Sequence, residues 1–471
     1  MLFNSIPFLI FFPIVTALFY LLPHKYRWIH LLAASCFFYM FFVPQYILIL
    51  LITIVIDYAA GIYLEKTEGK RRKLFLVVSV VSTCLVLVIF KYLNFFNQNM
   101  ISLSHYLGFY YPDRFINIIL PIGLSFHTFQ SLSYVIEVYR GNQKAEKHFG
   151  VYSLYVMFYP QLVTGPIERP QNLLRQLREK KIFQLSNVIR GLRLVLFGLF
   201  VKMVIADNLA VFVDQVYENP AIYNSYSLLT ALLFYSFQIY CDFFGYSTIA
   251  LGCALTMGYS ITDNFKTPYL SKNITEFWHR WHISLSTWFR DYVYFPMGGN
   301  RVKMPRWILN IAVVFVLSGF WHGANWTFIF WGGSYALIYL IEHAFRKNVK
   351  LDFSKNLILS KILHGVAIMK NFVLVTLIWV FFRAVNLSQI KQFYASIYHN
   401  FHVKDDFVVG RKIWLFLAFF VVMDVILRKS RFDTWCSNRS FVVRWLIYAV
   451  MLFLIIAFSS VESFPFIYFQ F

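Results

Sequence analysis

Charged residues are scarce in this sequence: they make up 14% of the 471 residues, whereas a soluble domain carries about 25%. Hydrophobic residues reach 59% and aromatic residues 21%, and the mean hydropathy is +0.59. One water-soluble core cannot bury so much apolar surface. Apolar runs recur that are long enough to cross a hydrocarbon layer of roughly 30 Å as helices. The sequence therefore predicts an all-α polytopic integral membrane protein.

Cysteine pairs with metal-binding or redox spacing are also missing. The five cysteines show no CxxC spacing and lie mostly in apolar runs, so they are interpreted as small hydrophobic residues: Cys36, Cys84, Cys241, Cys253 and Cys436. Acidic residues are few, 22 against 43 Lys and Arg, which gives a net charge of +21. In a membrane protein, basic cytoplasmic loops and contact with anionic lipid headgroups explain this excess. Membrane lipids are therefore expected partners and nucleic acid is not.

The N-terminal stretch lacks the basic start and small-residue cleavage site of a secretory signal, so we interpret it as a first span. No repeat of fixed period, low-complexity tract or appended soluble domain stands out. We therefore expect a single membrane-embedded domain over residues 1–471. Spans are predicted at about 6–22, 28–43, 46–64, 74–93, 116–138, 189–206, 228–257, 366–385, 412–427 and 442–460.

The positions of lysine and arginine predict the orientation of these spans. Lys70–Lys73 and Arg175–Lys181 are strongly basic and are expected in the cytoplasm, which places both termini outside. The short apolar run at 149–164 has basic flanks on both sides and is broken by Pro160, so it is predicted to be a re-entrant hairpin. An acidic outer loop is expected to begin at Asp207. The total is roughly 11–13 transmembrane or re-entrant helices.

A histidine interrupts one of the apolar runs. His322 lies at the turn between two apolar arms, about 307–321 and 324–341. Together the arms are expected to start and finish on the cytoplasmic side. Burying an imidazole at that depth costs free energy unless the ring has a partner or a chemical role. The preceding segment 273–292 holds two more histidines. Asn273 or Thr275 is expected to cap the start of a helix there. Because aromatic residues are mixed with Arg in this segment, the helix could also be an amphipathic helix at the membrane surface.

Three chemistries are considered for these histidines. A metal site would use His279, His282 and His322, but no cysteine or carboxylate cluster completes it. Nucleophilic catalysis by serine has no GxSxG elbow to support it. General-base catalysis needs one neutral imidazole near a hydroxyl group, which fits His322 best. A structural role for His322 remains open, as it does for His127.

The ordered motifs of the chain resemble the membrane-bound O-acyltransferases, and in particular a bacterial branch that includes alginate O-acetylation, peptidoglycan O-acetylation and teichoic-acid D-alanylation proteins. The resemblance covers most of residues 1–345, with a core at about 115–345. It is carried by NITEFWHRWHISLSTWFRDYVYFPMGGNR (273–301), SGFWHGANWTFIFWGG (318–333), LPIGLSFHTFQSLSY (120–134), TGPIER (164–169) and QIYCDFFGY (238–246).

This resemblance implies helices around a central tunnel, with His322 as the catalytic base and His282 as the second catalytic residue. Asp242 is a candidate either for the tunnel lining or for a structural ion pair. The sequence departs from the family at Thr248, where an acidic residue is usual, which weakens any role for that position. Further candidates to line the tunnel are Trp321, Asn325 and Trp278.

The resemblance further implies acyl transfer, with acetyl as the first expectation, from a cytoplasmic thioester such as acetyl-CoA to an extracytoplasmic polysaccharide. No bound cofactor or metal is expected. The implied partners are a secreted SGNH-type acyltransferase or a polysaccharide synthase complex, and the implied location is the bacterial cytoplasmic membrane. D-alanyl transfer to a cell-wall polymer, a transporter or flippase, and a scaffold of a synthase complex are the alternatives.

Overall fold

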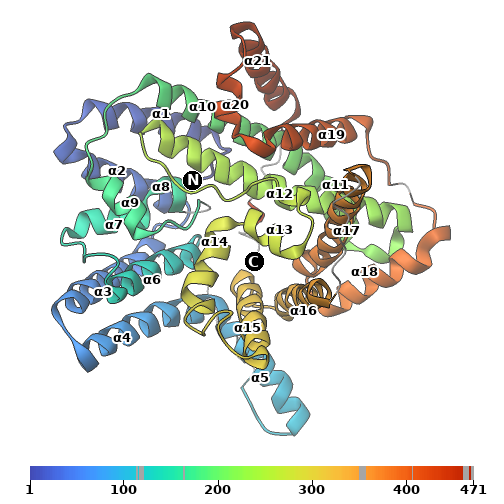
Figure 1. The fold of residues 1–471 in the computed structure, drawn as a ribbon, viewed down its shortest axis with the longest axis horizontal. Coiled ribbons are helices and arrows are strands. Elements are labelled where there is room, and N and C mark those ends of the chain that lie inside the picture. The colour runs from blue at the N-terminus through green and yellow to red at the C-terminus, as the bar shows by residue number, and fades with distance from the viewer. Residues whose placement is uncertain are drawn as a thin grey trace. The chain divides into compact units, whose positions relative to one another are not determined.

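The computed structural model describes residues 1–112, 115, 121–162, 165–348, 357–405, 407–459 and 466–467, and every regular element among them is helical (Figure 1). The chain is a polytopic membrane protein, as the sequence predicts. Seven of the described helical stretches are long and apolar enough to cross a membrane, judged by length and composition: Tyr46–Lys66, Gly69–Leu107, Leu185–Glu218, Ser225–Thr256, Met304–His322, Ile358–Arg383 and Phe441–Phe458.

The chain divides into two compact units. Unit 1 comprises Met1–Leu192 and Ile249–Thr262, and unit 2 comprises Arg193–Thr248 and Asp263–Phe471. Helices α10 (Leu185–Phe200) and α12 (Ser225–Thr256) contribute residues to both. The single domain expected over the whole chain stays a prediction.

Unit 1 contains the first nine α-helices of the chain. Ser5 begins the first of them, because its hydroxyl oxygen accepts the Phe8 N–H. Gly141, at φ +79°, ends α6 in the left-handed conformation that glycine adopts readily. The helices are α1 (Ile6–Leu21), α2 (His24–Met40), α3 (Tyr46–Lys66), α4 (Gly69–Leu87), α5 (Leu93–Leu107), α6 (Leu124–Arg140), α7 (Phe149–Met157), α8 (Tyr159–Leu162) and α9 (Pro170–Arg178).

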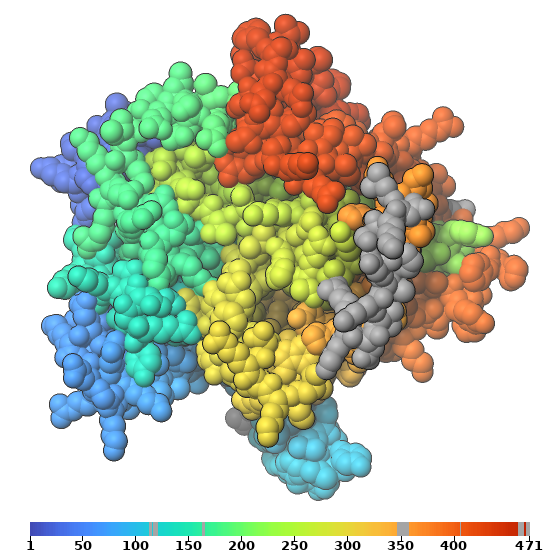
Figure 2. Space-filling model, viewed as in Figure 1, coloured from blue at the N-terminus to red at the C-terminus, as the bar shows by residue number. Residues whose placement is uncertain are grey.

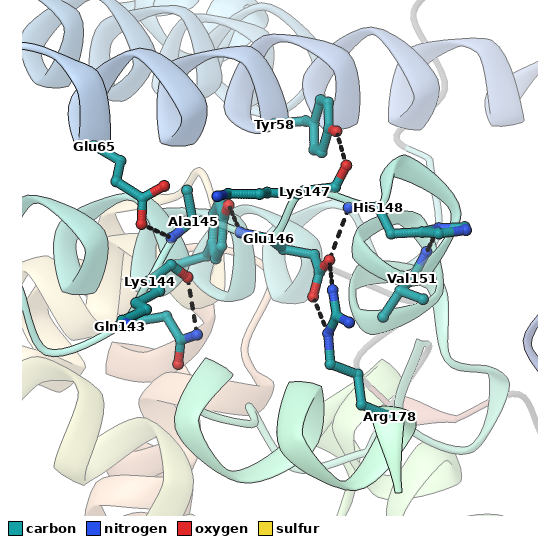
Figure 3. A network of polar contacts seen from close by, with 11 residues as sticks. Tyr58, Glu65, Gln143, Lys144, Ala145, Glu146, Lys147, His148, Val151 and Arg178 are labelled. Carbon is teal, nitrogen blue, oxygen red and sulfur yellow. Dashed lines mark hydrogen bonds and ion pairs between the residues drawn. The ribbon is translucent and has the colours of Figure 1, made fainter.

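The segment predicted to be re-entrant forms two short helices, α7 and α8, whose residues are almost entirely buried. Glu146 precedes α7 and Arg178 ends α9, and their side chains form an ion pair with two contacts (Figure 3). The chain therefore leaves this segment close to where it entered, as a hairpin does. The last two residues of the predicted segment, 163 and 164, lie outside the described residues, as does the start of the span predicted at 116–138.

Two basic segments lie at the C-terminal end of α6. Arg72 donates to the carbonyl oxygen of Val138 at 3.2 Å. Near the same end, the Tyr134 hydroxyl accepts the N–H of Glu146 at 2.9 Å, and Glu146 holds Arg178 (Figure 3). The start of α4, which holds the basic residues 70–73, and the end of α9 are thereby tied to one end of one helix. That both face the same side of the membrane stays a prediction.

Unit 2 contains the remaining helices, and α21 stands out at the surface with its apolar side chains exposed (Figure 2). A π-helical turn, η2 (Val201–Ala206), joins α10 to α11 without a break. The other helices of this part are α11 (Asp207–Glu218), α13 (Ile274–Arg280), α14 (Ile283–Phe289), α15 (Met304–His322), α16 (Trp326–Asn348), α17 (Leu357–Arg383), α18 (Leu387–His399), α19 (Arg411–Ile426), α20 (Phe432–Ser437) and α21 (Phe441–Phe458).

The expectation of an outer loop beginning at Asp207 is wrong. Asp207 is the first residue of α11 and is buried, with its carboxylate 2.6 Å from the ammonium group of Lys202. A carboxylate that pairs with a buried cation does not need water, so the helix continues where the sequence indicated a loop.

Helices α15 and α16 form the expected hairpin around His322, and two glycines allow them to approach closely. A Cβ on Gly319 would lie 2.1 Å from the carbonyl oxygen of Phe328, and one on Gly332 would lie 2.2 Å from that of Phe315. Both distances are far shorter than any real carbon–oxygen contact. The two glycines therefore set the separation of the backbones that carry His322.

Candidate active site

His322 is the last residue of α15 and is buried, with 4% of its surface exposed. Aromatic rings from three positions surround its imidazole. The centroid distances are 4.8 Å to Trp321, 5.1 Å to Trp331 and 5.2 Å to Phe382, and all three pairs meet edge to face. The imidazole is therefore enclosed by aromatic side chains.

His282 is fully buried and lies in the left-handed conformation, with φ +43° and ψ +54°. This backbone is uncommon for any residue other than glycine and costs of order 1–3 kcal/mol. The reading of 273–292 as one continuous helix is therefore wrong, because α13 ends at Arg280 and α14 begins at Ile283. The start of α13 is as predicted, since Asn273 Oδ1 accepts the Glu276 N–H at 2.9 Å.

Asn264 holds this break in place. Its backbone carbonyl accepts the N–H of Ile283 at 3.0 Å, and its side-chain oxygen accepts the Ser284 N–H at 3.3 Å and the Ser284 hydroxyl at 2.7 Å. Donors at the start of α14 that have no partner within the helix are satisfied in this way. The hydrogen bonds keep His282 in its strained conformation, and burial lowers its pKa to about 3, so the imidazole is neutral.

Trp321 contacts both histidines. Its ring centroid is 6.3 Å from that of His282 and 4.8 Å from that of His322. His282 also packs against Phe243 of α12, with the ring centroids 4.6 Å apart. Residues 40 positions apart in the sequence are thus brought to one aromatic cluster. The catalytic pairing of the two histidines that the resemblance implies stays a prediction.

Trp278 belongs to the same aromatic cluster, but it is connected to His322 through Trp331. It is half-buried and contacts Trp331 at 5.7 Å and Tyr335 at 5.0 Å, and Trp331 in turn contacts His322. The Trp278 indole N–H is buried and makes no hydrogen bond within the described residues. Trp331 and Phe382 were missed by the sequence reasoning, because nothing distinguishes them from other aromatic residues in an apolar run.

Asn325 stabilises the turn that follows His322. Its side-chain oxygen accepts the Thr327 N–H at 3.1 Å, and its side-chain nitrogen donates to the Val385 carbonyl at 2.7 Å. Both polar groups are thus engaged with the backbone at the start of α16 and just beyond the end of α17. A tunnel-lining role for Asn325 stays a prediction.

Asp242 is part of a buried group of charges. Lys202 lies between two carboxylates, 2.5 Å from Asp242 and 2.6 Å from Asp207, and the backbone N–H of Ile467 donates to Asp242 at 2.7 Å. The structural ion pair weighed for Asp242 is present, while its role in lining a tunnel stays a prediction. Lys202, a lone lysine inside an apolar run, was the signal in the sequence for this group.

His279 is exposed, unlike His282 and His322. Among the residues that the structure describes, no three His, Cys, Asp or Glu side chains gather into a group that could hold a metal ion. His127, in unit 1, is buried and hydrogen-bonded to the Thr53 hydroxyl. The histidines brought together are therefore His282 and His322.

His282 at a helix break and His322 at a helix end thus place two buried imidazoles in one aromatic cluster. The comparison with known families adds the class of protein. Residues 148–385 match the membrane-bound O-acyltransferase family, MBOAT, and this range contains both histidines. The chain belongs to this family and is an O-acyltransferase.

Similar proteins span most of the chain. It is 35% identical over 403 residues to the probable alginate O-acetylase AlgI of Pseudomonas aeruginosa, which covers 84% of this chain and 75% of the relative. It is 34% identical over 388 residues to the peptidoglycan O-acetyltransferase of Helicobacter pylori, covering 76% and 71%. The teichoic acid D-alanyltransferase of Bacillus subtilis is 30% identical over 245 residues, covering 49% and 61%.

Proposed function

We propose that this protein moves an acyl group, most simply acetyl, from a cytoplasmic thioester such as acetyl-CoA to a hydroxyl group for the O-acetylation of an extracytoplasmic polysaccharide. The observation that carries this proposal is the pair of buried histidines that both contact Trp321 in a chain of the O-acyltransferase family. An exposed or isolated histidine would not support it.

In this proposal His322 is the general base. Its neutral imidazole takes the proton of the acceptor hydroxyl while the oxygen attacks the thioester carbonyl. The tetrahedral intermediate then expels the thiolate as the carbon–sulfur bond breaks, and the proton passes from the imidazolium to the leaving sulfur. His282, neutral because it is buried, orients the hydroxyl or polarises the carbonyl.

The wider setting is proposed from the relatives. Proteins named for alginate and peptidoglycan O-acetylation cover most of this chain, which supports a carbohydrate polymer as the final acceptor. We place the protein in the bacterial cytoplasmic membrane with both termini outside, and we expect the acyl group to pass through a tunnel to a secreted SGNH-type acyltransferase or a polysaccharide synthase complex. Asp242, Trp321, Asn325 and Trp278 are the proposed lining residues.

Transfer of D-alanine is the second candidate, because a teichoic acid D-alanyltransferase is among the relatives. That match covers about half of this chain, whereas the O-acetylation relatives cover three quarters or more. The difference in coverage favours acetyl. Offering purified protein an acetyl and a D-alanyl thioester in parallel, each with the polymer it would modify, distinguishes the two.

The proposal is tested with three variants of histidines in one segment. Inverted membrane vesicles are supplied with labelled acetyl-CoA, and label transferred to hydroxyl acceptors is measured per folded protein. His282→Ala is expected to reduce transfer strongly, and His282→Asn to retain more folded protein because asparagine tolerates the left-handed backbone. His279→Ala is the matched control, since this exposed side chain lies three residues away. Equal activity of all three variants and the wild type would contradict the role proposed for His282.

A further inference from the structure

A pocket of about 250 Å³ in unit 1 has four Lys or Arg side chains among its lining residues. Lys25 and Arg27 come from the start of α2, whereas Arg178 ends α9 and Lys181 follows it. The single carboxylate among the lining residues belongs to Glu179. The pocket therefore carries a net positive charge, contributed by two segments about 150 residues apart in the chain.

Arg27 has a fixed position and an unneutralised charge. Its guanidinium donates to the carbonyl oxygens of Leu22 at 3.0 Å and Lys181 at 2.5 Å, and it lies 4.8 Å from the centre of the Phe19 ring. Carbonyl groups orient the guanidinium but bring no opposing charge. No ion pair involves Arg27 in the part of the chain that the structure describes. A charge held in this way is ready for an anionic ligand.

Two other cations of the pocket are also held in place. Arg178 is fixed by the buried carboxylate of Glu146 (Figure 3), and about half of its side chain remains exposed (54%). A guanidinium has five N–H donors, so pairing with one carboxylate leaves donors for a ligand. Lys181 pairs with Glu179 at 2.9 Å and lies 5.4 Å from the Tyr259 ring centre.

Unit 1 also holds an apolar groove of about 480 Å³. Its lining includes Ala17 and Tyr20 of α1 and Val188 and Leu192 of α10. The groove approaches the pocket at Tyr20, because Arg27 donates to the Tyr20 carbonyl at 3.4 Å and its guanidinium lies 5.7 Å from the Tyr20 ring. A cation that lines the pocket thus contacts a residue that lines the groove.

We propose that this combined site binds one anionic phospholipid, with its phosphate in the cationic pocket and one acyl chain in the groove. A pocket of this size has the volume of roughly eight water molecules at about 30 Å³ each, which is room for a phosphate and the polar headgroup attached to it. Basic pockets between helices on the cytoplasmic side of a membrane bind anionic headgroups, and both basic segments are predicted to face the cytoplasm. The lipid joins the α1–α2 loop to the end of the re-entrant hairpin.

The test uses the full-length protein, purified in a neutral detergent and stripped of lipid. Phosphatidylglycerol and phosphatidylcholine with identical acyl chains are added separately, and thermal unfolding and native mass spectrometry report stabilisation and retained lipid. The expected result is one phosphatidylglycerol retained per chain, with a higher unfolding midpoint than phosphatidylcholine gives. Equal retention of the two lipids would overturn the proposal.

Variants separate the two halves of the site. Lys25→Gln, which removes an exposed ammonium, is expected to weaken phosphatidylglycerol binding about five-fold, the effect of one cation near an anionic headgroup. Ala17→Phe fills the groove and is expected to weaken long-chain binding while leaving the headgroup pocket intact. Arg71→Gln is the control, because it removes an exposed cation from the first turn of α4, in the same unit but outside the pocket lining. Weakening by Arg71→Gln equal to that by Lys25→Gln would show unspecific attraction and overturn the site.

A phosphate from another source is distinguished in the same experiment. Inorganic phosphate and acetyl-CoA are added as competitors of phosphatidylglycerol. The proposal expects neither to displace the lipid at millimolar concentration, because neither has a chain for the groove. Displacement by acetyl-CoA, together with an unchanged affinity in Ala17→Phe, would assign the pocket to the phosphates of a soluble ligand instead.

Discussion

At the scale of single residues, Lys202 is a buried cation whose charge is balanced by two buried carboxylates. Its ammonium group is 2% exposed and lies within 2.6 Å of both Asp207 and Asp242. Removing one partner of a buried ion pair typically costs about 3–5 kcal/mol, because a charge is left buried without compensation. Here two carboxylates would be left facing each other. The group also receives the Ile467 N–H, so the loss would extend to the chain near residue 467.

Lys202→Met is therefore expected to lower the unfolding midpoint of the purified protein by many degrees, as measured by thermal unfolding in detergent. The triple variant Lys202→Met with Asp207→Asn and Asp242→Asn removes every charge and is expected to recover most of the loss. A midpoint of Lys202→Met equal to that of the wild type would show that this group does not stabilise the fold.

At the scale of elements, the α15–α16 hairpin determines where His322 lies. The short distance between the α15 and α16 backbones depends on Gly319 and Gly332, whose hydrogens face the backbone of the opposite helix. Gly333, the next residue, has nothing within 4 Å of the position a Cβ would take. Neighbouring glycines of one helix therefore differ in a way that can be measured.

Gly332→Ala is expected to separate the two helices and to reduce both stability and acyl transfer, because the added carbon meets the Phe315 backbone rather than a flexible side chain. Gly333→Ala is expected to be neutral or to stabilise by about 0.5–1 kcal/mol, since alanine favours a helix over glycine. Thermal unfolding and activity of the two variants check this pair. Equal behaviour of both would contradict the close approach described for Gly332.

The sequence predicted correctly those features that depend on residues close to one another in the chain. The Asn273 cap and the turn after His322 could be predicted because each depends on neighbouring residues. The break at Trp281–His282 could not, because it depends on Asn264, which lies 18 residues before His282 and is held there by tertiary folding. Asp207 was misplaced for the same reason, since an acidic residue after an apolar run indicates a loop unless its cation is known.

At the scale of the whole molecule, the distribution of basic residues predicts the orientation in the membrane. The start of α4 and the end of α9 are tied to the same end of α6, so they are expected on one side. Single cysteines replacing Arg71 and Glu179, both exposed, test this in a background without the five native cysteines.

Both cysteines are expected to react with a membrane-impermeant maleimide only when the cytoplasmic side is accessible. A cysteine replacing Gln45, in the uncharged loop predicted to lie outside, is expected to react in intact cells and serves as the control. Labelling of the Arg71 and Glu179 positions from opposite sides would contradict both the re-entrant hairpin and the predicted orientation.

The most direct test of the central claim is the turnover of His322→Ala, measured as acyl transfer per folded molecule. An apolar side chain at this buried position is not penalised by the membrane, so expression and insertion are expected to stay near those of the wild type. The account predicts a loss of transfer of at least about 10²-fold, the smallest typical contribution of general acid–base catalysis. Folded His322→Ala that turns over at the wild-type rate would contradict the role of His322 as catalytic base.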